Sequence, residues 1–263
     1  MAITEKMLAR KDGPIGWMTF NNPEQRNAMS AEMWDAVIEI VADFDADPDI
    51  RVLVLAGAGG KAFVSGIDIS QLDQIRANAE QVGHHNGVAE RAGVALSAVV
   101  KPTIAMIQGY CIGGGVGIAL RCDLRIAAEG SKFGIPAAKL GVGYGYPGAK
   151  MLTDAIGPAR AKDLFFTARQ LDASEALHIG LVNHVVPAAD LESFTRNYAA
   201  TIAGNAPLTV KTAKLAVNAA IADAGRRDLG TIESSVDACF ASEDYKEGRR
   251  AFTEKRPARF SGR

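Results

Sequence analysis

Hydrophobic residues along the chain alternate between short continuous runs and longer stretches of helical period. The runs at residues 50–57 and 101–109 are almost entirely apolar, which is typical of strands buried on both faces of a sheet. Further strands are predicted at residues 15–23, 122–130 and 182–186. Helical patterns separate these strands, so the sequence predicts an α/β fold around a largely parallel sheet.

The helical patterns are of two kinds, some between the strands and some after them. Ser30 can cap a helix whose apolar positions recur until Asp47-Pro48. Other helices are predicted at residues 147–157, 159–167 and 174–179. After Pro187 the strand signals end and four helical patterns follow. A boundary near residues 187–205 therefore separates an α/β core from a helical tail.

Composition narrows the class of protein. The 263 residues are 48% hydrophobic and 22% charged, with a formal net charge of −1, so neither a nucleic-acid nor a membrane partner is predicted. No apolar run approaches a membrane span, and the first residues lack the apolar core of a signal peptide. Three cysteines without a C-x-x-C pair predict free thiols in a reducing compartment. We expect a cytoplasmic protein.

Glycine gathers in three segments where predicted strands meet predicted helices, at residues 56–70, 108–120 and 140–150. The first matches G-x-G-x-x-A loosely, but no helical pattern opens there, so a dinucleotide site is disfavoured. The chain has no phosphate-binding P-loop motif and no G-x-S-x-G motif, and its histidines show no metal-ligand spacing with the cysteines.

Two of these segments suit a different chemistry. Glycines before a helix leave backbone N–H groups open to a ligand, and two such groups converging on one oxygen form an oxyanion hole. The segments VSGID and IGGGVG are candidates for the two halves. The alternative is that the glycines only permit tight turns or close helix packing, and the segments by themselves leave both interpretations open.

Longer stretches carry a family resemblance. The chain contains, in this order, NNPEQRNAMS, KAFVSGIDIS, KPTIAMIQGYCIGGGVGIALRCDLRIAAEGSKFGIP, GPARAKDLFFTARQLDASEALHIGLVNHVVP and SEDYKEGRRAFTEKRP. These stretches resemble the crotonase family, the enoyl-CoA hydratase/isomerase superfamily. The resemblance implies an acyl-CoA-binding core of β-β-α spiral turns at residues 1–195 and a helical oligomerisation region at 196–263. It also implies homotrimers that pair into hexamers, and no cofactor beyond the coenzyme A of the substrate.

The resemblance also assigns residues to the thioester and to coenzyme A. The backbone N–H groups of Ile67 and Gly114 would hold the thioester oxygen. Arg26 would lie near the CoA phosphates, and Lys255 with Arg256 would reach the CoA of a neighbouring subunit; for these cations a solvated surface charge is the alternative. The CoA adenine and pantetheine would run past Ala28, Lys61, Ala62, Gly66, Asp68 and Ile69.

At two positions the chain departs from the family's hydratases. These use two glutamates as base and acid, one three residues beyond the middle glycine of GGG and one after the proline of FG-x-P. Here the two positions are Gly117 and Ala137, and neither side chain can transfer a proton. The departure favours non-classical lyase chemistry such as decarboxylation. A hydratase or isomerase with another acid, for which Asp73 and Glu80 are candidates, and a non-catalytic acyl-CoA-binding protein remain alternatives.

Tyr144 is the candidate replacement group. Its loop, LGVGYGYPG, resembles that of methylmalonyl-CoA decarboxylase-type members, which implies a hydrogen bond from the tyrosine to the substrate carboxylate. A packed aromatic is the alternative. Such members carry a histidine at the position of Ile67. We further expect packing roles for Tyr110 and Cys111 and a structural role for Asp123. An apolar acyl pocket is expected at Val88, Leu96 and Val142.

Overall fold

The strands form two sheets. The computed structural model describes residues 2–66 and 79–263. A seven-stranded sheet has the order β1-β2-β3-β4-β6-β8-β11, antiparallel as far as β3 and parallel from there on. Its strands are β1 (Ala2–Thr4), β2 (Met7–Asp12), β3 (Ile15–Phe20), β4 (Val52–Gly57), β6 (Thr103–Ile107), β8 (Leu124–Ala128) and β11 (His184–Val186). A four-stranded sheet, in the order β10-β9-β7-β5, holds β5 (Ala62–Val64), β7 (Tyr110–Ile112), β9 (Lys132–Gly134) and β10 (Gln170–Asp172).

From β4 to β9, consecutive strands alternate between the two sheets. The chain passes from β4 to β5, from β6 to β7 and from β8 to β9, and each pair contributes one strand to each sheet. The matching strands of successive pairs run parallel. Helices follow the second strand of the later pairs, which confirms the predicted spiral of β-β-α turns.

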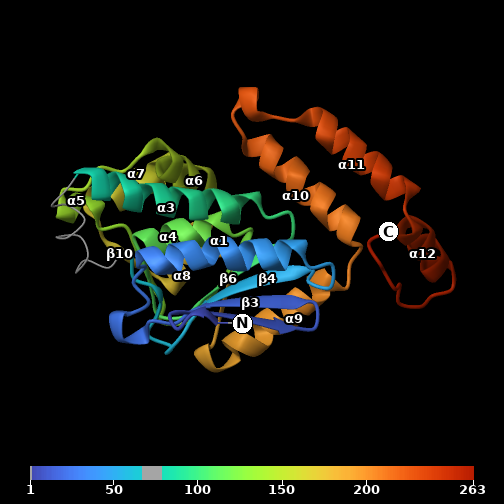
Figure 1. Cartoon of the computed structure of the whole chain (residues 1–263), viewed down its shortest axis with the longest axis horizontal. Helices are drawn as coiled ribbons and strands as arrows, with labels where there is room; N and C mark the ends of the chain where they lie inside the picture. The colour runs from blue at the N-terminus through green and yellow to red at the C-terminus, as the bar shows by residue number, and fades with distance from the viewer. Residues whose placement is uncertain (1, 67–78) are drawn as a thin grey trace.

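Helices cover both faces of the large sheet and also form a separate group (Figure 1). Those of the core are α1 (Ala31–Ala46), α3 (Ala79–Ala98), α4 (Gly114–Arg121), α5 (Ala137–Leu140), α6 (Tyr146–Ile156), α7 (Pro158–Thr167), α8 (Ala173–His178) and α9 (Leu191–Ala203). The later helices are α10 (Pro207–Ile221), α11 (Leu229–Ala241) and α12 (Glu243–Thr253). Short 3-10 turns lie at η1 (Pro23–Gln25), η2 (Ala188–Asp190) and η3 (Ala224–Arg226). None of the helices in the described part of the chain is long and apolar enough to cross a membrane.

The central strand β4 shows why its sequence is continuously apolar. Val52 and Val54 face a cluster that includes Leu191 and Ala199 of α9. Leu53 belongs to the larger core on the opposite face, with α1 and α3. Because successive side chains of a strand point to opposite faces, a strand covered on both sides needs apolar residues at every position. This confirms the prediction for residues 50–57.

The helices α10, α11 and α12 extend away from the two sheets (Figure 1). A partly buried ion pair fastens the first of them to the core: Lys214 Nζ lies 2.8 Å from Asp123 Oδ2 and also donates to the Lys101 carbonyl. The same Asp123 oxygen accepts hydrogen bonds from the backbone N–H and hydroxyl of Thr103. Asp123 thus has the structural role expected from the sequence, and it links β6 to α10.

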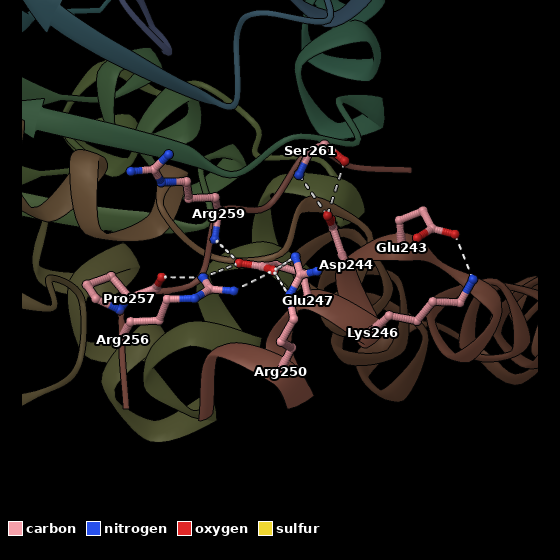
Figure 2. Close-up of a pocket in the computed structure, with 9 residues that line it drawn as sticks. All are labelled: Glu243, Asp244, Lys246, Glu247, Arg250, Arg256, Pro257, Arg259 and Ser261. Carbon is pink, nitrogen blue, oxygen red and sulfur yellow. Dashed lines mark hydrogen bonds and ion pairs between the residues drawn. The ribbon is translucent and has the colours of Figure 1, made fainter. Parts of the chain in front are cut away.

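A second charged cluster folds the C-terminus back over α12. Figure 2 shows the Glu247 carboxylate between Arg256 and Arg250, with the backbone N–H of Arg259 donating to it as well. These donors hold the pKa of Glu247 well below its usual range. Asp244 accepts the N–H groups of Ser261 and Gly262. The residues after α12 are therefore tied to α12 itself.

The structure corrects several expected elements. Strands β1 and β2 were not predicted, and neither were the three-residue strands of the small sheet. The strand expected at residues 182–186 begins at His184, because the N–H groups of Leu181 and Val182 bond back to the Ala176 carbonyl at the end of α8. Residue 195, where the core was expected to end, lies inside α9, which packs on the large sheet, and the division into core and oligomerisation region stays a prediction.

Helix α4 packs unusually close to the small sheet. A Cβ on Gly115 would lie 2.1 Å from the Val64 carbonyl oxygen, which no side chain can tolerate. Gly109, in the link from β6 to β7, is equally confined, since its Cβ would lie 2.1 Å from the Lys61 carbonyl oxygen. Gly117, one turn into α4, differs: apart from the helix's own backbone, no heavy atom of the described residues would lie within 4 Å of its Cβ.

This difference predicts opposite effects of the same substitution on α4. Gly115→Ala should lower the unfolding temperature, because overpacking costs about 1–3 kcal/mol. Gly117→Ala should leave it unchanged or raise it, since alanine favours a helix by about 0.5–1 kcal/mol over glycine. Differential scanning calorimetry of both variants measures the contrast. A larger loss at position 117 than at 115 would contradict the packing described.

Candidate functional site

One end of the small sheet gathers several of the residues expected to bind coenzyme A. The Arg26 carbonyl accepts the Ser65 N–H at 3.2 Å, and the Met29 N–H donates to the Gly66 carbonyl at 2.9 Å. The segment 26–29 therefore lies along the end of β5, which brings Arg26 and Ala28 next to Ala62 and Gly66. Lys61 begins this same stretch, and its carbonyl accepts the Tyr110 N–H.

Asn27 holds this arrangement together and was not singled out from the sequence. It is fully buried, and its side-chain amide donates to the carbonyls of Ala58 at 3.0 Å and Ala62 at 2.7 Å. Its Oδ1 accepts the Asn22 N–H at 2.9 Å. Its φ of 57° is in the left-handed region that asparagine tolerates better than most residues. The sequence signal available for this role was an asparagine that directly follows an arginine in a predicted turn.

Gly114 is the first residue of α4 and lies against the Gly66 segment. A Cβ on Gly114 would be 3.7 Å from the Gly66 Cα, and one on Gly66 would be 4.0 Å from the Gly114 nitrogen. The Gly114 N–H has no acceptor among the described residues, as expected for the first turn of a helix. Gly113 before it is fixed by its N–H bond to the Gly134 carbonyl of β9. The two glycine segments that the sequence suggested as halves of one site are therefore adjacent.

Three of the expected site residues, Ile67, Asp68 and Ile69, lie outside the described residues. The same holds for Asp73, a candidate replacement acid. Glu80 lies near the start of α3, in residues 79–86, for which only the backbone is described. Of the expected oxyanion pair, the described structure therefore contains the Gly114 half.

The two positions at which the family resemblance implies glutamates in hydratases are both close to this site. Gly117 is on α4, one turn from Gly114, and the space beside it is open. Ala137 begins α5, directly after Pro136, whose ring would lie 3.9 Å from a Cβ on Gly113. A side chain at either position could reach the glycine segments, and neither residue supplies a carboxylate.

Tyr144 lies in the loop between α5 and α6 and is partly packed. Its ring contacts that of Phe165 on α7, with centroids 4.8 Å apart, and Gly148 leaves room for it. Burial raises the pKa of Tyr144, while the nearby Arg121 guanidinium opposes that rise. The hydroxyl is therefore a neutral hydrogen-bond donor at physiological pH. The residue remains 37% exposed, so both its packed and its functional interpretation have a structural basis.

The three cations expected to contact coenzyme A lie in different parts of the structure. Arg26 lies over the Tyr110 ring, 5.3 Å from the centroid, at the edge of the gathered residues. Lys255 follows α12, which is well separated from α4 in the same chain (Figure 1). Arg256 is bound to Glu247 and Glu254. Neither Lys255 nor Arg256 joins Gly114 within one chain.

Several other expectations concern side chains around the site. Burial raises the pKa of the Cys111 thiol, so this cysteine packs rather than reacts. All three cysteines are free, as expected. Val88 and Leu96 are fully buried in the core, and only Val142 of the expected acyl pocket is accessible. The acyl pocket expected from these three residues stays a prediction.

Arg121 is a further residue that sequence reasoning missed. It ends α4, and its Nε is buried without a hydrogen-bond partner in the described part of the chain. Burial lowers its pKa, against the influence of Tyr144 and Glu90. An arginine four residues after Gly117, in a helix of otherwise small and apolar residues, was the available signal.

Comparison with known proteins shows the family to which the chain belongs. The family model of enoyl-CoA hydratase/isomerase matches residues 10–263. A protein of Mycobacterium bovis named "Probable enoyl-CoA hydratase" is 39% identical over 260 residues, which are 98% of this chain and 99% of that protein. The short-chain-enoyl-CoA hydratase of Clostridium acetobutylicum is 34% identical over 250 residues, 95% of either chain.

Solved structures agree in fold as well. The crystal structure of an enoyl-CoA hydratase/isomerase family protein from Hyphomonas neptunium superposes with a TM-score of 0.92 at 34% identity, covering 100% of both chains. The match spans both sheets, the glycine segments and the later helices. The chain therefore belongs to the enoyl-CoA hydratase/isomerase family, the crotonase superfamily, and acts on acyl-CoA thioesters as an enzyme of that family.

Proposed function

We propose that this chain stabilises a thioester enolate at a backbone oxyanion site and forms that enolate without the two glutamates of ordinary hydratases. The observation that carries the proposal is the combination found on α4: an open N–H at Gly114 and no carboxylate at position 117. Ala137 removes the second carboxylate in the same way. In this proposal Arg26, Ala28, Lys61, Ala62 and Gly66 flank the coenzyme A, together with Asp68 and Ile69.

Decarboxylation of a malonyl-type thioester suits such a site. The bond between Cα and the carboxylate carbon breaks, CO2 leaves, and the electron pair of that bond becomes the enolate, whose charge the thioester oxygen carries. The N–H groups of Gly114 and Ile67 donate to that oxygen, and each such donor typically contributes ~10²–10³ in rate. The enolate then takes one proton at Cα from solvent. No base is required, because loss of CO2 itself generates the enolate.

Hydration with a different acid is the second candidate. It is favoured by the names of the relatives, which are enoyl-CoA hydratases. Water addition needs a base and an acid within hydrogen-bond reach of the water and of the substrate. In this candidate Asp73 or Glu80 would replace the missing glutamates. A protein that binds acyl-CoA without turning it over is a further outcome of the experiments below.

The lack of a carboxylate at positions 117 and 137 predicts poor hydratase activity. Wild-type protein should add water to crotonyl-CoA far more slowly than an ordinary hydratase, because each missing acid or base typically costs ~10²–10⁴ in rate. The double variant Gly117→Glu with Ala137→Glu should gain activity, since the space beside Gly117 is open. Loss of the enoyl absorbance measures both rates. Fast hydration by the wild type would refute the proposal and favour the second candidate.

Tyr144 is predicted to assist decarboxylation. With a malonyl-type CoA thioester, Tyr144→Phe should reduce the rate about 10–100-fold, the loss of one hydrogen bond to a charged group. Since burial raises the pKa of Tyr144, its hydroxyl stays protonated, and its contribution should not decline between pH 7 and 9. Mass spectrometry of the products measures the rates. Tyr146→Phe, an exposed tyrosine on α6, is the matched control; equal rates for both variants would exclude the role.

We also propose that the chain forms a homo-oligomer, a trimer or a hexamer. The later helices expose large apolar side chains, among them Val217 on α10, Phe240 on α11 and Phe252 on α12. Such patches on a folded chain commonly mark contact surfaces. Light scattering coupled to gel filtration should give three or six times the mass of one chain, and Phe240→Asp should lower that mass. A wild-type protein that runs as a monomer would contradict this.

A further inference from the structure

One face of α4 forms a continuous stripe with an unusual composition. Gly114, Gly117 and Arg121 are three and four residues apart, so they lie on the same side of the helix. All three are only partly buried, whereas Gly115, Val116, Ile118 and Ala119 on the other sides are buried. The stripe begins at the open N–H of Gly114, continues over a position without a side chain, and ends at a cation.

The guanidinium of Arg121 lacks an acidic partner. Its Nη1 lies 3.4 Å from the Gly117 carbonyl oxygen and 3.5 Å from the Met151 sulfur, both poor substitutes for a carboxylate. Its Nε is buried with no acceptor at all among the described residues. No carboxylate of those residues is within ion-pair distance of it. Burying a cation is costly unless it is paired, so the environment of Arg121 is incomplete for a purely structural arginine.

Neighbouring residues accommodate the guanidinium rather than neutralise it. On α3, a Cβ at Gly93 would lie 2.4 Å from Arg121 Nε, so the glycine makes room for the side chain. Glu90 on α3 influences Arg121 only from a distance and is exposed. Asp154 on α6 is paired with Lys150.

Arg125 provides the comparison within the same chain. It is also largely buried, but it donates to the carbonyls of Leu181, Cys122 and Ala119. Its donors are thus satisfied by backbone oxygens, as a structural arginine requires. Arg121 differs in having an unsatisfied donor.

Gly117 leaves room beside α4 between Gly114 and Arg121. Apart from the helix's own backbone, no heavy atom of the described residues lies within 4 Å of where the Gly117 Cβ would be. Long helical side chains lean toward the N-terminus of their helix, and Nη1 of Arg121 accordingly reaches the Gly117 carbonyl oxygen. Arg121 also borders a cavity of about 790 Å³ between α4, α6 and α10, which neither Gly114 nor Gly117 lines.

We propose that Arg121 binds a carboxylate at the distal end of the substrate's acyl group, so that the preferred substrates are CoA thioesters of dicarboxylic acids. This inference rests on the proposed function in one respect, the placement of the thioester oxygen at Gly114. Arg121 would supply two N–H donors to the carboxylate, and the neutral hydroxyl of Tyr144 would supply a third.

The hydratase glutamate would be incompatible with this role. A glutamate at position 117 would be four residues before Arg121, the favourable orientation for an ion pair on a helix. It would occupy the open space and neutralise the guanidinium. Gly117 and Arg121 therefore form one feature: the first leaves room for a substrate carboxylate, and the second binds it.

The test compares binding of matched thioesters by isothermal titration calorimetry at low salt. Wild-type protein should bind succinyl-CoA more tightly than butyryl-CoA, and glutaryl-CoA more tightly than valeryl-CoA, by about 10–100-fold, as for a hydrogen-bonded charge. Arg121→Met should abolish this preference while changing the affinity for the neutral thioesters little. Arg121→Lys should retain part of it. Arg91→Met, an exposed arginine on α3, is the matched control and should retain the full preference.

Thermal unfolding distinguishes binding from structural support. If Arg121 serves the substrate, the ligand-free Arg121→Met variant should be as stable as the wild type or more so, because an unpaired buried charge has been removed. A clear drop in unfolding temperature, with equal loss of affinity for neutral and charged thioesters, would show a structural role and overturn the proposal. Absence of any preference in the wild type would overturn it directly.

The same measurements separate this inference from the proposed reaction. Turnover of malonyl-CoA without any preference for carboxylated thioesters would leave the proposed reaction standing and overturn the role of Arg121. A preference that depends on Arg121, without turnover of any thioester, would support the binding site and overturn the reaction. If no acyl-CoA binds, both fail.

Discussion

The arrangement of the site depends on one close contact between backbones, that of Gly115 in α4 with Val64 in β5. Helix α4 cannot approach the small sheet at this distance with any side chain in between. The approach sets where the helix begins, and so where the Gly114 N–H lies relative to Gly66. Asn27 completes the constraint from the other side by binding the carbonyls of Ala58 and Ala62. The geometry proposed for thioester binding is therefore fixed by main-chain contacts.

Because main-chain contacts fix the geometry of the site, the reacting side chains are free to differ from those of relatives. Such differences change the net charge of the site. Gly117 and Ala137 remove two potential negative charges, and Arg121 adds a positive one that no described residue balances. A site that activates water with a pair of glutamates would have the opposite balance, since its base is a carboxylate. The local charge, more than the fold, is what argues for a negatively charged substrate here.

Sequence patterns predicted the features that depend on local or repeated signals. The strands β4 and β6 were evident as continuous apolar runs, and the spiral followed from family motifs. Strands β5, β7, β9 and β10 are only three residues long, too short for any periodicity to appear. The amphipathic signal of β2 was too weak, because Arg10, Lys11 and Asp12 leave it with a polar end. The lack of an acidic partner for Arg121 could not be predicted from the sequence. It depends on the residues packed around the guanidinium, Gly93, Met151 and Tyr144, which are remote from Arg121 in the sequence.

The open space beside Gly117 has a consequence for the use of this scaffold in protein engineering. A Cβ introduced there meets no heavy atom of another described residue within 4 Å, and it starts one helical turn from the proposed oxyanion donor. Arg121, one turn further along α4, is the charged neighbour that such a side chain would meet. Thiol, imidazole and carboxylate groups placed at this position could therefore be compared at one fixed location beside the same cation.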